Sequence, residues 1–584
     1  MLDALPPIVL AAVAVAAAAL WQWAGTALML KAVPRELSDG WRIALAAALW
    51  LPVSGAAAMA LSLAHLAGRA SLLAGTALVL LASIPNARWL LQQARRGFAS
   101  LFDGASRTER YVVGAALFVQ VVFILFAAHP QRIYDQLNYH LVVGELVVRD
   151  GQPFTGAWDP HAMFTGVVEW GLSWHRSWGG SKLFFHGLAQ IAVYFATVPA
   201  LILAGLLLAR PTALWFAALC LALPGVVPEN SILRMAKPDG VVLALVALAL
   251  AVLPRSTLAA LGLCLLSMAC KASAFHGALA LGAAAVAVGY RRGTPWIALL
   301  GAAALAVQLC KNALVFANPV YPALGALFPS WATDAWTEQY WRGFAFEHLP
   351  RWRGWLGPVF FLWPARVLAG MLLIAAVWQR PRQVKPIVVF AASYAVLWPL
   401  FYGGTIPARF VSPFSAGLLV LWWLLVASLA QPARRRVEIL SLLLAITVCG
   451  LGWAAMNIVK WNHASAVDAY AMQWPRIHTA RALQPLLEPS ETIVADAPEK
   501  FFFDAKLLYE EPLSPRERAI LQGLREDAVH TAAANKVKAV IVGAGHPMSP
   551  GMQRIWDALR SRGRVLELPP DRVLFSECYF CPPR

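Results

Sequence analysis

The sequence predicts an α-helical polytopic membrane protein with a small C-terminal extracytoplasmic α/β domain. Hydrophobic residues make up 59% of the 584 residues, charged residues make up only 14%, and the mean hydropathy is +0.60. Long apolar runs recur as far as Asn457, and short basic segments separate them. This combination is typical of a chain that uses the bilayer as its solvent.

A helix needs roughly twenty apolar residues to cross the hydrocarbon core of a bilayer, and counting such runs predicts about 13 to 14 transmembrane helices. The run after Asp3 lacks the cleavage site of a signal peptide, so we interpret it as a retained span. The runs on either side of Lys271 are two helices or one broken helix. The predicted spans lie at 5–30, 41–66, 70–90, 111–128, 183–208, 211–227, 240–254, 257–270, 272–290, 294–316, 356–378, 386–402, 411–430 and 437–457.

The net charge of +17 is concentrated in short loops between these runs. No basic face with stacking aromatics lies on a soluble module, so we expect no nucleic-acid partner. Basic loops lie on the cytoplasmic side of a membrane, and simple alternation places all the clusters on that one side. The clusters are Lys31, Arg35 and Arg42; Arg95, Arg96, Arg107 and Arg110; Arg291 and Arg292; Arg380, Arg382 and Lys385; and Arg434, Arg435 and Arg436.

This orientation predicts a multi-pass protein of the bacterial inner membrane. Both termini lie outside the cytoplasm, together with the loops 129–182 and 317–355 and the segment 458–584. The last segment is more charged, and Thr492–Asp496 and Val537–Val542 are expected to be buried strands on either side of a helix over Ser514–Ala533. The sequence therefore predicts a compact periplasmic α/β domain.

Two short motifs lie in this domain. Gly543-Ala544-Gly545 lacks the third glycine of a dinucleotide fingerprint. Cys578 and Cys581 favour a local disulfide.

Charged residues converge on the outer side of the predicted spans, where each is a candidate for function because its burial is costly. Bases there can hold a lipid phosphate, and a carboxylate can take a proton from an acceptor. Asp135 heads the first outer loop. The other members are Glu145, Asp159, His161, Glu169, Glu229, Arg234, Lys237, Asp239, Lys271, His276 and Arg409.

Structural roles compete with these assignments. Asp135 can cap a helix that begins at Gln136, and Asp239 can interact with the positive end of the span that it precedes. Lys271 and Arg409 can extend their charges to the membrane interface. Four histidines suggest a metal site: His140, His161, His175 and His186. Their spacing is irregular, so we assign no metal ligand. We expect no required cofactor, and the sequence leaves open whether the protein binds a divalent cation.

Five motifs, in this order, resemble those of the polytopic GT-C glycosyltransferases that use polyprenyl-phosphate sugars, a group that includes the lipid A aminoarabinose transferases and the protein O-mannosyltransferases. The likeness spans roughly 111–457. The motifs are Tyr134-Asp135-Gln136-Leu137-Asn138-Tyr139-His140, Lys237-Pro238-Asp239-Gly240, Cys270-Lys271-Ala272-Ser273, Asn318-Pro319-Val320-Tyr321-Pro322 and Ala408-Arg409-Phe410-Val411-Ser412-Pro413.

The resemblance implies that Asp135 is the general base and that Asp239 is a second acidic residue at the catalytic centre. It implies that 111–457 is the catalytic core and that 1–110 contributes extra N-terminal helices. Many relatives have a glutamate where Gln136 stands, so a two-carboxylate mechanism would need Asp159, Glu169 or Asp239. We assign the donor phosphate to Lys271, Arg409, Arg234 and Lys237, and substrate binding to Tyr134, Gln136, Asn138, Tyr139, His140, Asp159 and Glu169.

The function that we expect is inverting transfer of a sugar from a polyprenyl-phosphate donor to an extracytoplasmic glycolipid, polysaccharide or protein. Two alternatives stay open. A transporter or lipid flippase would line a path with the same charges, although transporters commonly show internal repeats and none is evident here. The protein could also be a catalytically inactive relative that acts as a scaffold, because Gln136 stands where many relatives have a glutamate.

Overall fold

The computed structural model describes most of the helical body and most of the C-terminal domain. The described residues are 5–128, 137, 140–151, 165–209, 212–225, 236–289, 293, 295–321, 327–328, 384–401, 412–429, 431–449, 466–471, 474, 476–496, 503, 505–509, 515–543 and 548–580. The predicted span 356–378 and the loop 329–355 lie outside them.

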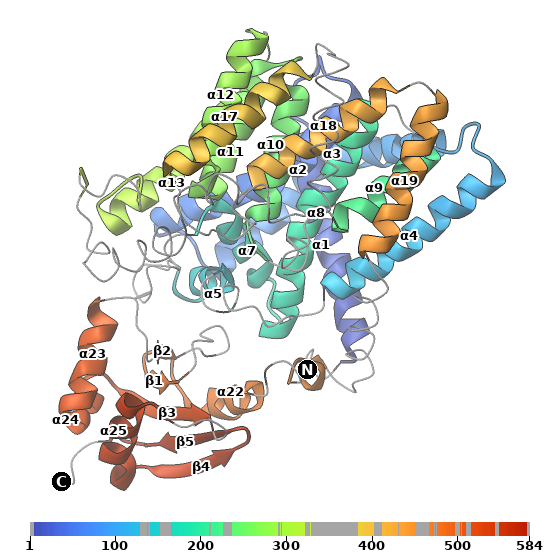
Figure 1. Cartoon of the computed structure of the whole chain (residues 1–584). Coiled ribbons are helices and arrows are strands. Elements are labelled where there is room, and N and C mark those ends of the chain that lie inside the picture. Colours follow the sequence, from blue (N-terminus) through green and yellow to red (C-terminus); the bar gives the residue numbers. More distant parts are fainter. Residues whose placement is uncertain are drawn as a thin grey trace.

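The helical body consists mainly of long apolar helices (Figure 1). Before the outer loop they are α1 (Pro7–Met29), α2 (Asp39–Leu63), α3 (Arg69–Ser100) and α4 (Arg107–Ala127). The next group is α5 (Leu141–Asp150), α7 (Val167–Ser177), α8 (Lys182–Ala209), α9 (Ala213–Gly225), α10 (Asp239–Val252) and α11 (Thr257–Cys270). The last group is η4 (Ala272–Ala274), α12 (Phe275–Val288), α13 (Trp296–Phe316), α17 (Lys385–Phe401), α18 (Ser412–Ser428) and α19 (Gln431–Cys449).

Each predicted span within the described residues coincides with one of these helices. Six of the helices are long and apolar enough to cross a membrane by length and composition: α1, α2, α3, α4, α8 and α13. The structure confirms the predicted fold class. Lys271 lies in an extended conformation between α11 and α12, so the two runs around it are separate helices.

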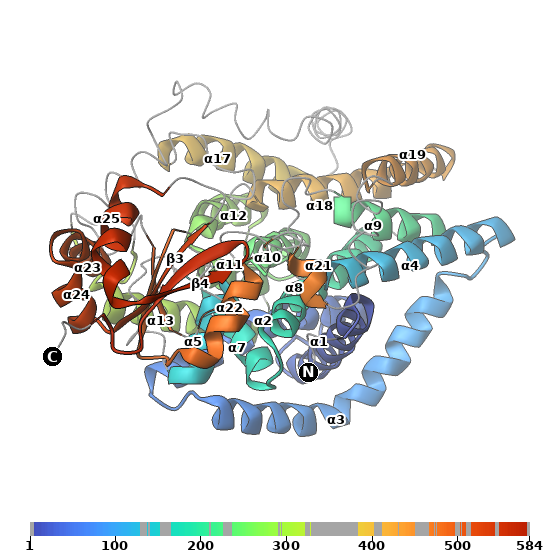
Figure 2. The same cartoon turned by 90° about the horizontal axis from the view of Figure 1, so that it is seen from below.

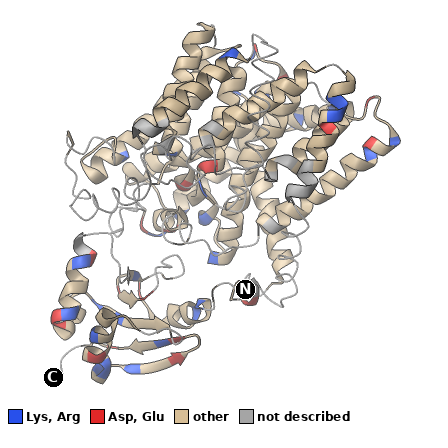
Figure 3. Ribbon diagram, viewed as in Figure 1, with Lys and Arg blue, Asp and Glu red and all other residues tan. Residues whose placement is uncertain are grey.

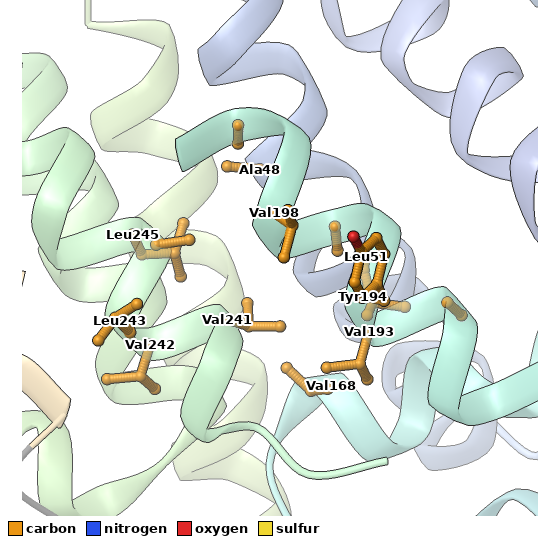
Figure 4. Packing of buried hydrophobic residues seen from close by; sticks show 14 of the residues in the cluster. Ala48, Leu51, Val168, Val193, Tyr194, Val198, Val241, Val242, Leu243 and Leu245 are labelled. Atoms are coloured by element: carbon orange, nitrogen blue, oxygen red, sulfur yellow. The ribbon is translucent and has the colours of Figure 1, made fainter. Parts of the chain in front are cut away.

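The centre of the body is built from α2, α7, α8 and α10. All 14 residues of α10 are buried, which explains why its sequence is apolar on every side. Val168 of α7, Val193 of α8 and Val241 of α10 lie close together in this core (Figure 4). The short helix α7 is therefore held from several directions by long helices.

Helices α2 and α7 approach closely through glycine. A Cβ added to Gly55 would lie 1.6 Å from the carbonyl oxygen of Val167, which no side chain tolerates. Nearby, the indole N–H of Trp174 donates a hydrogen bond of 2.8 Å to the Ser54 carbonyl. The N-terminal helix α2 thus sets the position of α7.

The C-terminal domain contains a five-stranded sheet in the order β2-β1-β3-β5-β4. β2, β1 and β3 are parallel, and β5 runs antiparallel to β3 and β4. The two predicted strands are confirmed, and the predicted helical segment between them is divided at Asp527 into α23 and α24, whereas β2, β4, β5 and α25 were not predicted. The elements are α21 (Ala466–Ala471), α22 (Ile477–Leu483), η6 (Gln484–Leu486), β1 (Thr492–Ala495), β2 (Lys506–Tyr509), α23 (Pro515–Glu526), α24 (Ala528–Ala534), β3 (Val537–Gly543), α25 (Pro550–Leu559), η8 (Arg560–Arg562), β4 (Arg564–Leu568) and β5 (Asp571–Phe575).

The two faces of this sheet have different partners. One face packs with α23, α24 and α25 around Trp556, while Ile493 and Ile541 on the other face join the hydrophobic core of the helical body. The helix α22 lies against the sheet near β4 (Figure 2). The N-terminus lies on the same side of the body as this domain (Figure 1). The two therefore lie at the same end of the helical body, and their side of the membrane stays a prediction.

Charged side chains are sparse in the helical body and frequent in the C-terminal domain (Figure 3). The few charges inside the body are consequently informative, because an ionised group buried among apolar helices needs a partner. Those that lie at the ends of α7, α10 and α11 form the candidate site.

Candidate active site

The structure describes five of the residues that the sequence predicted for the site: His140, Glu169, Lys237, Asp239 and Lys271. It brings four of them into two close pairs. The other predicted residues lie outside the described residues, and their roles stay predictions: Tyr134, Asp135, Gln136, Asn138, Tyr139, Asp159, Arg234 and Arg409.

The first pair joins α5 to α7. His140 directly precedes α5, and its Nδ1 lies 2.8 Å from Oε1 of Glu169 in the first turn of α7. The other carboxylate oxygen, Oε2, accepts a hydrogen bond of 3.1 Å from the backbone N–H of Gly166. Glu169 is 1% exposed. It therefore closes the N-terminus of α7 and positions the imidazole at the same time.

The second pair joins α10 to α11. Asp239 is the first residue of α10, and its Oδ1 lies 2.5 Å from Nζ of Lys271 at the C-terminus of α11. Asp239 is 2% exposed, and its Oδ2 has no hydrogen-bond partner among the described residues. Lys237 is also buried, two residues before Asp239. A carboxylate and an ammonium group are thus held in the interior at one end of the helical body.

Close backbone packing brings the two pairs together. A Cβ added to Gly166 would lie 2.1 Å from the carbonyl oxygen of Cys270, so the residue before α7 touches the residue before Lys271. Only glycine permits this approach without displacing the backbone. The two pairs also interact electrostatically. Burial has the largest effect on the pKa of the Glu169 carboxyl, and of the charges of the second pair Lys271 lowers this pKa while Asp239 raises it.

Lys311 is a further member of the cluster that the sequence analysis did not assign. It lies on α13, is wholly buried, and its Nζ donates a hydrogen bond of 3.0 Å to the carbonyl of Thr165, next to Gly166. It also interacts electrostatically with Glu169. The signal was present in the sequence, because a lysine inside the apolar span 294–316 is unusual enough to be a candidate for function.

Burial dominates the electrostatics of this cluster. Desolvation raises the pKa of Glu169 to about 8, because the charged carboxylate is poorly solvated in the interior. Glu169 is therefore mostly protonated at neutral pH, and it can donate a proton to His140 or accept one from it.

Among the described residues, no group of three or more His, Cys, Asp and Glu side chains is close enough to hold a metal ion. The cluster nevertheless combines two amines, two carboxyl groups and an imidazole. Amines of this kind can bind a phosphate group, and a carboxylate can orient an amine or move a proton. Helices α5 and α7 lie on the side of the helical body that faces the C-terminal domain (Figure 1).

The fold is similar to that of two solved structures of ArnT from Cupriavidus metallidurans. One is bound to undecaprenyl phosphate; the TM-score is 0.53 at 12% sequence identity, covering 81% of this chain and 99% of that chain. The other is in the apo state, with a TM-score of 0.51 at 12% identity, covering 82% of this chain and 100% of that chain.

The chain has a GT-C-like fold. This confirms the family resemblance at the level of the fold. No protein-family model matches the chain, and no curated protein matches it.

Proposed function

We propose that the protein is a membrane glycosyltransferase that moves a sugar from a polyprenyl-phosphate donor to an extracytoplasmic acceptor, which is a glycolipid, a polysaccharide or a protein. The observation that carries the proposal is the buried cluster of Glu169, Asp239, Lys271 and Lys311. It lies within a GT-C-like fold, and a solved protein of similar fold is bound to undecaprenyl phosphate.

In this proposal the lysines receive the donor phosphate. Lys271 is partly exposed, with 17% of its side chain accessible, whereas Asp239 behind it is 3% accessible. A carboxylate in this position holds the ammonium group in place before the donor arrives, which lowers the entropic cost of binding. Arg409, Arg234 and Lys237 would add further positive charge.

The reaction is a single displacement. A hydroxyl group of the acceptor attacks the anomeric carbon, and the bond between that carbon and the phosphate oxygen breaks. The proton of the hydroxyl passes to Asp135, and the lipid phosphate leaves with its charge stabilised by the lysines. Attack opposite the leaving group inverts the configuration. No nucleotide-binding domain is needed, because the donor arrives from the membrane.

The orientation belongs to the same proposal. The protein lies in the bacterial inner membrane, with the cluster and the C-terminal domain in the periplasm and the basic loops in the cytoplasm. Maleimide labelling of single cysteines, introduced at Arg107 and at Arg572 in a background without other cysteines, tests it in intact cells. Labelling at position 572 alone by an impermeant reagent is expected, and the reverse would overturn the orientation.

The reaction is tested with the full chain in nanodiscs and radiolabelled undecaprenyl-phosphate pentoses and hexoses. We expect release of undecaprenyl phosphate that falls by at least about a hundredfold in Asp135→Asn, because a general base is lost. Asp150→Asn is the matched control, since Asp150 lies at the end of α5 and pairs with Arg149. Equal turnover by Asp135→Asn would overturn the role of Asp135, and no turnover of any donor by the folded wild type would overturn the reaction.

A further inference from the structure

A cavity of about 720 Å³ lies at the opposite end of α10 from the candidate site. Asp239 begins α10 at the site, and the chain reaches the cavity at Arg255, just beyond the end of the helix. The 14 residues of α10 span about 21 Å, so the cavity is distinct from the site. The turn before α2 and the turn before α13 complete its walls, through residues such as Glu36 and Pro295.

Arg255 is a cation of this cavity, and among the described residues it has no acidic partner. Its guanidinium carbon lies 5.1 Å from the ring centre of the buried Trp41, and Nη1 donates a hydrogen bond of 3.1 Å to the Ala251 carbonyl. These contacts fix the plane of the guanidinium and leave its other N–H groups available. An arginine held in this manner is suited to a phosphate, which it can bind through two parallel hydrogen bonds.

The remaining walls add polar groups and apolar surface. The hydroxyl of Ser38 forms no hydrogen bond in the described part of the chain, and Ser256 lies next to Arg255. Glu36 is exposed at the same cavity and has no basic partner in the described structure. Pro34, Leu37 and Pro295 form an apolar border. Among the described residues, the cavity thus offers one cation, one carboxylate and an apolar rim at the end of an apolar helix.

We propose that this cavity binds a zwitterionic phospholipid headgroup from the adjacent leaflet, with the phosphate on Arg255 and a primary ammonium on Glu36. Basic pockets between transmembrane helices are suited to lipid headgroups, and the carboxylate favours a headgroup that also carries a positive charge. The volume is in the range of small-molecule sites. Such a lipid would join the start of α2 to the end of α10 and the start of α13, which are parts of the body that reach the candidate site.

Native mass spectrometry of the full chain tests this proposal with phosphatidylethanolamine, phosphatidylglycerol and inorganic phosphate as probes. The wild type is expected to retain phosphatidylethanolamine in preference to phosphatidylglycerol. Arg255→Gln is expected to weaken phosphatidylethanolamine binding by about tenfold or more, because a charge-assisted hydrogen bond is lost. Glu36→Gln is expected to remove the preference while phosphatidylglycerol still binds.

The control is Arg107→Gln, which removes an arginine of α4 that contacts Tyr111 and does not line the cavity. It is expected to bind phosphatidylethanolamine as the wild type does. Arg255→Lys, which keeps the charge, separates loss of binding from loss of folding. Equal binding by Arg255→Gln and the wild type would overturn the proposal. Displacement of the lipid by millimolar inorganic phosphate, or no preference between the two lipids in the wild type, would also overturn the assignment of the headgroup.

Discussion

The ammonium group of Lys271 lies 2.5 Å from the carboxylate of Asp239, although the two residues are 32 positions apart and begin or end different helices. Breaking a buried pair of this kind leaves an uncompensated charge. We therefore expect Lys271→Met to lower the free energy of unfolding by about 3 kcal/mol. Thermal denaturation of the protein in detergent measures it.

The same pair allows a second comparison. The double variant Asp239→Leu with Lys271→Met removes both charges, so it should be more stable than Lys271→Met alone. Both variants are expected to lose sugar transfer if the pair binds the donor. A melting temperature of Lys271→Met equal to that of the wild type would show that Asp239 does not depend on Lys271.

The raised pKa of Glu169 leads to a prediction of how the free energy of unfolding depends on pH. Its pKa is raised from 4.5 to about 8 in the folded protein, so the folded state holds a proton that the unfolded state releases. The contribution of Glu169 to stability is therefore fully present below pH 4.5 and is lost as the pH rises towards 8, with no further change from this group above that. Melting temperatures measured between pH 5 and 9 check this.

The matched variant for this experiment is Glu169→Gln, which keeps an oxygen acceptor for the N–H of Gly166 but cannot titrate. Its melting temperature should vary less between pH 5 and 8 than that of the wild type. Glu567→Gln, on the exposed part of β4, should leave the pH dependence unchanged. The same slope in Glu169→Gln and the wild type would assign the effect to another group.

Gly55 tests whether α2 positions α7. Gly55→Ala places a Cβ against the carbonyl of Val167, and overpacking of this kind costs about 1–3 kcal/mol. Because α7 carries Glu169, sugar transfer should fall as well. Gly114→Ala on α4 is the control, since nothing lies within 4 Å of its Cβ; it should be neutral or more stable by up to about 1 kcal/mol. Equal melting temperatures for the two variants would contradict the close packing.

Arg476 holds the C-terminal domain together at the ends of its strands. It lies 2.8 Å from Asp496 after β1 and 2.7 Å from Asp571 at the start of β5, and Asp571 is 1% exposed. Arg476→Met should destabilise this domain by about 3 kcal/mol, because two carboxylates lose their cation. Arg572→Met, which breaks an exposed pair with Glu567, should cost less than about 1 kcal/mol. Limited proteolysis of the domain measures both, and equal protease resistance would refute the difference.

Much of the fold follows from the sequence. The apolar runs predicted the described helices of the spans, whereas α5 and α7 within the outer loop were not predicted. The strands Thr492–Ala495 and Val537–Gly543 were recognised as buried runs of hydrophobic residues. The strand Arg564–Leu568 was not predicted, because it is largely exposed and carries the polar residues of an edge strand. The strand Asp571–Phe575 is mostly buried and was not predicted either. Their pairing depends on contacts with β3 that no local pattern encodes.

For the site, the sequence by itself determined which charged residues lie next to apolar segments, where burial without a partner costs free energy. These are Glu169, Asp239 and Lys271. Only the tertiary structure decided that Glu169 pairs with His140, that Asp239 pairs with Lys271, and that Lys311 joins them from α13. The physical reason is that local sequence sets hydrophobicity and helix length, whereas the partner of a buried charge depends on which helices pack together. Close contacts such as that of Gly166 with Cys270 set that packing.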